Sequence, residues 1–121
     1  MPYRILVVDD DADLSETIVR LLRRYGYTCL TAASGSEGIE LITTEVPTLV
    51  VTDLHMSGID GLAVARWARD RIPPIPVILM TAYPTRAAHA LAWIPDGTLY
   101  LSKPFATADF LRAVQDALGR T

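Results

Sequence analysis

Residues 5–11 read Ile-Leu-Val-Val-Asp-Asp-Asp, an unbroken apolar run that ends abruptly in three acids. A strand that is apolar at every position is covered on both faces, as strands are in a parallel sheet flanked by helices. Further apolar or β-branched runs follow, and we expect strands at 4–9, 27–32, 48–53, 75–81 and 98–102. Their spacing leaves room for a crossover helix between successive strands, which predicts a doubly wound parallel α/β sheet.

Helical patterns fill the intervals between these runs. The first has an apolar stripe that ends at Gly26, a residue suited to the left-handed position after a helix. The sequence Ser-Gly-Ser-Glu at 34–37 fits a capping box and predicts the start of the second helix. Apolar spacing predicts the third helix around 62–68 and the last around 110–118. The fourth is expected at 85–93, where an alanine-rich segment has only a weak apolar stripe.

The composition of the chain argues against several classes of function. The chain has 121 residues, half of them hydrophobic, so we expect a single domain over 1–121. A net charge of −3 without a Lys/Arg cluster argues against direct nucleic-acid binding, which requires several neutralised phosphates. The single cysteine, Cys29, excludes an internal disulfide, and neither a leader nor an 18-residue apolar run occurs. We therefore expect a cytoplasmic protein that has no membrane segment.

Polar residues follow the expected central strands. Asp9 and Asp10 come after the first strand, Asp53 ends the third, Thr81 ends the fourth and Lys103 follows the fifth. The carboxyl ends of parallel strands meet at one edge of the sheet, where ligands bind in doubly wound folds. Clustered carboxylates repel one another unless a cation joins them, and hard oxygen ligands suit Mg²⁺. We therefore expect a magnesium site at this edge.

The same residues predict phosphoryl-transfer chemistry. A carboxylate beside a divalent metal can attack a phosphoryl donor and form an aspartyl phosphate, and we assign that role to Asp53. Lys103, the only lysine among eleven basic residues, supplies a compact positive charge for the carboxylate and the phosphoryl oxygens. The hydroxyl of Thr81 could donate a hydrogen bond to a further oxygen.

Together these stretches resemble the receiver domains of bacterial two-component response regulators. The resemblance spans essentially the whole chain and is carried by four motifs in family order: Val-Val-Asp-Asp-Asp at 7–11, the segment from Val51 to Gly61, Met-Thr-Ala at 80–82, and Tyr-Leu-Ser-Lys-Pro-Phe at 100–105. It implies a flavodoxin-like (βα)5 fold with five parallel strands in the order 2-1-3-4-5.

The resemblance also implies the site. Asp53 is expected to be the phosphoacceptor, and Asp9 and Asp10 are expected to bind Mg²⁺, or alternatively Mn²⁺, together with Asp53 and the backbone carbonyl of His55. Thr81 and Tyr100 look like the switch pair, in which the hydroxyl moves toward the phosphoryl group and the aromatic ring turns inward.

Further roles follow from the same resemblance. Lys103 looks like the phosphate-contacting lysine, and the peptide bond before Pro104 is expected to be cis. His55 and Tyr83 occupy positions that tune the attack of water on the acyl phosphate in this family. We expect the bulky Tyr83 to screen that water and to lengthen the phosphorylated state. From the residues alone, His55 is instead a solvated loop residue.

Other residues have simpler interpretations. Asp11 and Asp13 are expected to cap the first helix or to favour its dipole, and caps are the alternative to metal binding for Asp9 and Asp10 as well. Trp93 could pack at a helix end or anchor a partner, and we favour packing. Cys29, within a strand, is expected to be an inert core residue.

The predicted function is a phosphoacceptor switch and not an enzyme, with at most slow autodephosphorylation. The resemblance implies a sensor histidine kinase or phosphotransfer protein as donor. It also implies an effector domain or partner reached through the face of helix 4, strand 5 and helix 5, and phosphorylation-dependent homodimers as an option. The alternatives are a phosphorylation-independent interaction module and, less favoured, a phosphatase with an aspartate nucleophile, a class that usually has an acid where this chain has His55. A flavin or nucleotide site is disfavoured because three carboxylates follow the first strand and no glycine-rich phosphate loop occurs.

Overall fold

A computed structural model describes residues 3–83, 88 and 92–119 of the chain. Its elements, in chain order, are β1 (Arg4–Val8), α1 (Ala12–Arg24), β2 (Thr28–Ala32), α2 (Gly35–Glu45), β3 (Leu49–Asp53), α3 (Gly61–Arg69), β4 (Val77–Thr81), β5 (Thr98–Ser102) and α5 (Thr107–Gly119). All strand pairs are parallel, and the sheet order is β2-β1-β3-β4-β5. The predicted doubly wound, flavodoxin-like fold is confirmed.

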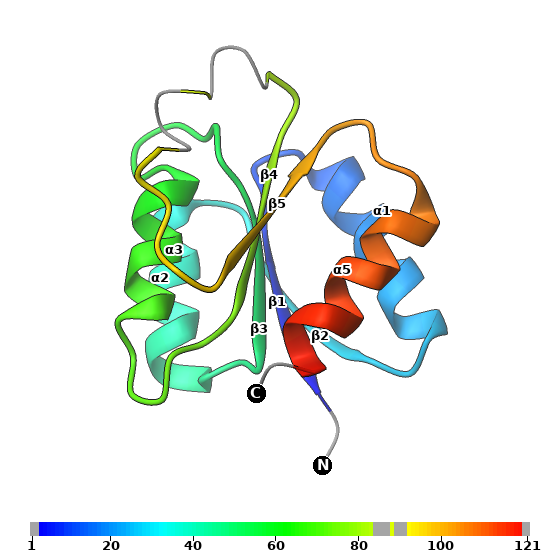
Figure 1. The fold of residues 1–121 in the computed structure, drawn as a ribbon, viewed down its shortest axis with the longest axis horizontal. Coiled ribbons are helices and arrows are strands. Elements are labelled where there is room, and N and C mark those ends of the chain that lie inside the picture. The colour runs from blue at the N-terminus through cyan, green and yellow to red at the C-terminus, as the bar shows by residue number, and fades with distance from the viewer. Residues whose placement is uncertain (1–2, 84–87, 89–91, 120–121) are drawn as a thin grey trace.

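Figure 1 shows the sheet nearly edge-on between two layers of helices, with α2 and α3 on one face and α1 and α5 on the other. The strand order reverses between β1 and β3, because β2 lies beyond β1 while β4 and β5 lie beyond β3. The carboxyl ends of these two central strands therefore meet at the switch point, where doubly wound proteins bind ligands.

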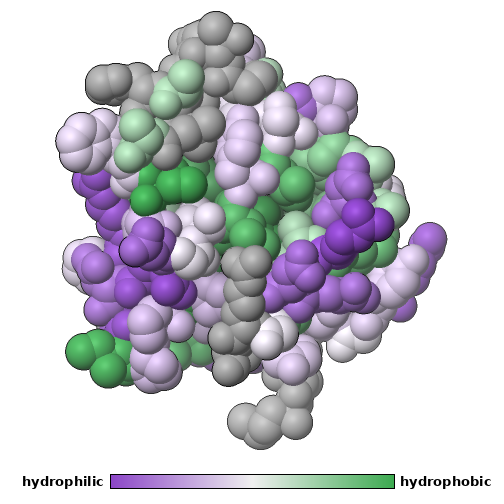
Figure 2. Space-filling view, in the orientation of Figure 1, coloured by the Kyte–Doolittle hydropathy of each residue, from purple (hydrophilic) through white to green (hydrophobic). Residues whose placement is uncertain are grey.

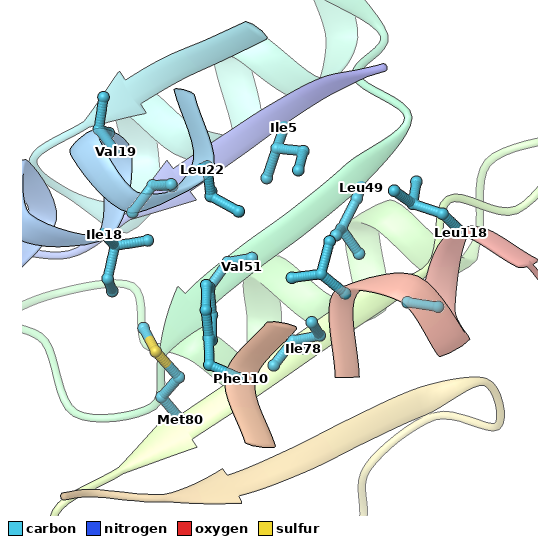
Figure 3. Close-up of a cluster of buried hydrophobic side chains, with 13 residues drawn as sticks. Ile5, Ile18, Val19, Leu22, Leu49, Val51, Ile78, Met80, Phe110 and Leu118 are labelled. Carbon is cyan, nitrogen blue, oxygen red and sulfur yellow. The ribbon is translucent and has the colours of Figure 1, made fainter. Parts of the chain in front are cut away.

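The buried residues of the central strands explain this layering. Successive side chains of a strand point to opposite faces, so the fully apolar β1 contributes Ile5 and Val7 to one core and Leu6 and Val8 to the other. In the first core, strand residues meet side chains from α1 and α5, among them the fully buried Phe110 (Figure 3). The continuous apolar runs thus identified the strands that are covered on both faces.

Four strand boundaries differ from the prediction: β1 ends one residue early, at Val8, and β3 begins one residue late, at Leu49. The other two differ for a hydrogen-bonding reason. β4 begins at Val77 and not at Ile75, because the Ile75 N–H donates to the Ala68 carbonyl at 3.0 Å and remains part of the α3–β4 connection. Pro76 has no N–H to give to the ladder. Tyr27, expected in β2, donates its N–H to the Leu22 carbonyl at 3.1 Å and belongs to the end of α1.

The helix ends follow the sequence signals closely. Gly26 has a φ of 90°, as expected for the left-handed position after α1. Ser34 Oγ accepts a hydrogen bond from the Glu37 N–H at 3.2 Å, which confirms the predicted cap of α2. The carboxylate of Glu37 accepts from the N–H of Ala33 at 3.2 Å, one residue before the position in the standard capping box. At the other end of α2, Val46 has a φ of 45°, which is strained for a β-branched residue.

Three expectations concern the remaining residues. Most of the helix expected at 85–93 lies outside the described residues. The packing predicted for Trp93 is wrong: its side chain is 62% exposed, because the turn before β5 places it at the surface. Cys29 is only partly buried, since β2 is an edge strand, and this burial raises the pKa of its thiol while Arg23 opposes the shift. Within the described ranges, no helix combines the length and apolarity that crossing a membrane requires.

Candidate functional site

Three carboxylates meet at the carboxyl edge of the sheet, on the β1–α1 connection and at the last residue of β3. Asp9, Asp10 and Asp53 each offer an oxygen within 4.8 Å of those of the other two. Asp9 and Asp53 are 2% and 7% exposed, whereas Asp10 is open to solvent. An oxygen cluster that is buried on one side and open on the other suits a hard divalent cation that keeps some of its water ligands.

Hydrogen bonds from backbone N–H groups show that Asp9 and Asp11 have different roles. Asp9 Oδ1 accepts a hydrogen bond from the Asp11 N–H at 2.9 Å, which holds the side chain at the strand end. Asp11 caps α1 by accepting from the N–H groups of Asp13 and Leu14, both at 3.1 Å. The prediction that Asp11 is a cap is confirmed. Asp13 lies within the first turn, where its negative charge favours the helix dipole.

Lys103 connects the β5 end of the site to the carboxylates. Its Nζ lies 3.1 Å from Asp53 Oδ1 and 3.4 Å from Asp9 Oδ2, and its side chain is only 16% exposed. The Lys103 N–H donates to the carbonyl of Thr81 at 2.6 Å, which fixes the start of the β5–α5 connection against β4. The peptide bond between Lys103 and Pro104 is cis, as predicted.

Burial dominates the electrostatics of Asp53. Desolvation raises the pKa of its carboxyl above the ordinary value, and the Asp9 charge adds to that shift. The ammonium of Lys103, through its charge and a hydrogen bond, opposes the shift, as does His55 to a smaller extent. The site therefore holds a poorly solvated carboxylate whose charge is compensated mainly by Lys103, and a further cation would stabilise it.

Thr81 ends β4, and Tyr100 lies on β5 opposite Leu79, two residues before Thr81. Thr81 is fully buried at the end of β4, and its Oγ1 accepts a hydrogen bond from the Tyr83 N–H at 3.0 Å. The hydroxyl oxygen of Tyr100 is buried, and among the described residues it has no hydrogen-bond partner.

His55 and Tyr83 form a contact that the sequence did not predict. Their rings lie edge to face, with centroids 5.5 Å apart and an interplanar angle of 74°. The Nε2 atom of His55 is buried and has no partner in the described part of the chain, which rules out the fully solvated loop residue that the sequence suggested. A surface cavity of about 510 Å³, lined by Asp10, His55 and Asp60, opens beside the pair.

Gly61 is a site residue that sequence reasoning missed. A Cβ at this position would collide with the backbone carbonyl of Asp53, well inside van der Waals contact. The first residue of α3 therefore packs directly on the backbone of the candidate nucleophile, and its N–H donates to the Leu54 carbonyl at 2.9 Å. The only sequence signal was a glycine directly after Asp60, which caps the helix by accepting from the Ala63 N–H at 3.0 Å.

This fold and site define a flavodoxin-like α/β protein with a carboxylate cluster and a lysine at its switch point. The family model for the response regulator receiver domain matches residues 5–115. The chain therefore belongs to the response regulator receiver domain family.

Relatives and solved structures agree with this assignment. The chain is 35% identical over 112 residues to the DNA-binding transcriptional regulator NtrC of Klebsiella pneumoniae, covering 93% of this chain and 24% of NtrC. It is 36% identical over 121 residues to the response regulator MprA of Mycolicibacterium vanbaalenii, covering 100% of this chain and 52% of MprA. The crystal structure of a response regulator receiver protein from Sinorhizobium medicae has a TM-score of 0.87 at 30% identity, covering 98% and 95% of the two chains. The chain thus spans about a quarter and about half of the two regulators.

Proposed function

We propose that this domain is a phosphoacceptor switch, in which Asp53 takes a phosphoryl group from the phosphohistidine of a sensor kinase or phosphotransfer protein. The observation that carries the proposal is the contact of Lys103 with both Asp53 and Asp9, within a cluster that includes Asp10. An Asp53 carboxylate oxygen attacks phosphorus, and the phosphorus–nitrogen bond of the donor breaks as the histidine nitrogen leaves with the electron pair.

The residues of the cluster fit Mg²⁺, with Mn²⁺ as the alternative. Asp9, Asp10 and Asp53 would hold the ion together with the carbonyl of His55. When bound, the ion offsets negative charge on the transferring group. Lys103 contributes its positive charge beside the same oxygens, and the partial burial of the site excludes bulk water and strengthens this attraction.

The switch uses Thr81 and Tyr100. Phosphorylation places new acceptor oxygens beside the end of β4, and the Thr81 hydroxyl turns to donate to one of them instead of remaining beside the Tyr83 N–H. The Tyr100 ring moves into the space that this rotation leaves. The resulting change on the surface of β5, α5 and the segment before β5 controls an effector domain or partner, or forms a homodimer.

His55 and Tyr83 are proposed to set the lifetime of the phosphorylated state. The two rings lie edge to face. In this proposal the pair covers part of the approach to Asp53 and excludes the water that would hydrolyse the acyl phosphate. Tyr83→Ala should therefore lose phosphate several-fold faster than wild type, measured as the decay of the phosphorylated protein in Mg²⁺. An unchanged decay rate would contradict this role.

The main proposal is tested by incubating the protein with Mg²⁺ and acetyl phosphate and following the mass of the intact chain. Wild type should gain one phosphoryl group, and Asp53→Asn should gain none. Asp109→Asn is the matched control, because that aspartate is exposed on α5, and it should react like wild type. An unmodified wild-type chain would instead support a phosphorylation-independent interaction module. Rapid turnover of phosphate esters would support the aspartate-nucleophile phosphatase.

A further inference from the structure

A second cavity lies at the opposite edge of the sheet, where the strands begin. It has a volume of about 800 Å³, within the range of roughly 300–1,000 Å³ typical of small-molecule sites. The residues preceding β3, β4 and β5 contribute to it, as do the last turns of α3 and α5. We call it the amino-end cleft, and its apolar lining includes Pro47, Ile75, Pro76, Leu99, Ala117 and Leu118. It shares no lining residue with the carboxylate cluster.

The lining of the amino-end cleft is poor in hydrogen-bonding groups. Four of its residues, Pro47, Pro73, Pro74 and Pro76, are prolines, which have no backbone N–H. Figure 2 shows hydrophobic residues in the middle of the visible face, between more hydrophilic surfaces on either side. An apolar body can enter such a cleft without leaving many backbone donors unsatisfied.

Arg69 is the only charged residue in the described lining of the cleft. Its Nε donates to the carbonyl of Asp96 at 2.7 Å, and its guanidinium lies against the Cα of Gly97. A Cβ at Gly97 would collide with the guanidinium, and Gly97 has a φ of 85°, so this glycine leaves room for the arginine. The backbone of the turn before β5 therefore holds the cation in a fixed position.

The guanidinium of Arg69 has unused binding capacity. Among the described residues, no carboxylate forms an ion pair with it. Arg4, at the start of β1, is in contrast bonded to the side chain of Glu45 and to its carbonyl. Arg69 is a partly buried residue whose guanidinium is held through Nε. Its two Nη groups remain for a planar anion, and a carboxylate matches that geometry.

From this geometry we infer that the amino-end cleft binds a small amphipathic carboxylate, with its apolar body between β5, α5 and the α3–β4 connection and its carboxylate on Arg69. The volume fits a ligand of fatty-acid or aryl-acid size, and the single fixed cation selects an acid over a neutral molecule of the same shape. The site is independent of the proposed phosphoryl transfer, because binding does not involve Asp53 or Lys103.

The test is a titration of the isotope-labelled domain with sodium octanoate, followed through the methyl resonances of Ile75, Leu99 and Leu118. Octanoate should shift these resonances saturably and bind wild type about tenfold more tightly than 1-octanol, as expected for a hydrogen bond to a charged group. Arg69→Met should remove this preference while still binding 1-octanol. Arg24→Met is the matched control, an exposed arginine on α1, and it should bind octanoate like wild type.

Several results would overturn the inference. Equal affinities of wild type for octanoate and 1-octanol would show that Arg69 does not select the acid, and this comparison requires no variant. Octanoate shifts confined to other residues would place any binding outside the cleft. If octanoate causes no shifts, but the same methyl resonances change with protein concentration, the amino-end cleft would instead be a contact between copies of the chain.

Discussion

Replacement of Lys103 by methionine tests the electrostatics of the carboxylate cluster most directly. The Nζ of Lys103 lies 3.1 Å from Asp53 Oδ1, a separation at which unit charges attract by about 5 kcal/mol if the effective dielectric constant is about 20. Desolvation of the two charges offsets much of that attraction, yet removal of one partner leaves the other buried and uncompensated. We expect Lys103→Met to lower the free energy of unfolding by about 3 kcal/mol near neutral pH without Mg²⁺.

The assay is urea denaturation followed by far-UV circular dichroism, in a double-mutant cycle with Asp53→Asn. If the loss of stability comes from the uncompensated carboxylates, Lys103→Met should lower the free energy of unfolding less in the Asp53→Asn background than in wild type. The coupling free energy should be about 1–3 kcal/mol. The remaining cost in that background reflects Asp9, which Lys103 also contacts at 3.4 Å. Mg²⁺ should stabilise Lys103→Met more than wild type, because the ion then replaces the missing positive charge.

Two results would refute this reasoning. The first is a loss of less than about 0.5 kcal/mol, within the range of ordinary surface substitutions. The second is an equal loss in both backgrounds, since the cost would then come from packing of the lysine stem and not from its charge.

Three further predictions use the same denaturation assay. Burial raises the pKa of Asp53, so its protonated form stabilises the native state at low pH, and that contribution is lost as the pH rises through the raised value. Asp53→Asn should therefore increase the free energy of unfolding near pH 7, and increase it less near pH 4. Val46→Gly should stabilise the domain by about 1 kcal/mol by relieving the positive φ of 45°, and an unchanged midpoint would show that no strain is stored there. Gly61→Ala should lower the free energy of unfolding by about 3 kcal/mol, because its Cβ meets the Asp53 carbonyl. Gly119→Ala, with open space around it, should change that free energy by less than about 0.5 kcal/mol. Similar effects of the two substitutions would contradict the close packing of Gly61 on Asp53.

The failures of the sequence predictions share a physical origin. The capping box at 34–37 and the cap formed by Asp11 were predictable because the bonding atoms lie within a few residues of each other. The exposure of Trp93 was not, because it depends on which surfaces the sheet leaves uncovered around the turn before β5. The start of β4 was placed two residues early, since the Ile75 N–H is taken by the carbonyl of Ala68, a residue of the preceding helix.

The sequence by itself determined the strands, the layers of helices and the edge that carries the acids. Its continuous apolar runs identify buried parallel strands, and the residues that follow such strands necessarily share one edge. The strand order 2-1-3-4-5 came from family resemblance, because periodicity carries no information about which strands are neighbours.

Only the tertiary structure decided how the functional groups meet. Lys103 and Asp9 are 94 positions apart, and their contact depends on β5 lying next to β4 and on β1 lying next to β3. The packing of Gly61 in α3 on Asp53 in β3 also depends on how these two elements are placed. The ring contact of His55 with Tyr83 and the position of Arg69 over Gly97 likewise join segments that are distant in the sequence. Such contacts depend on the relative placement of whole elements, whereas the propensity and spacing of neighbouring residues describe one element at a time.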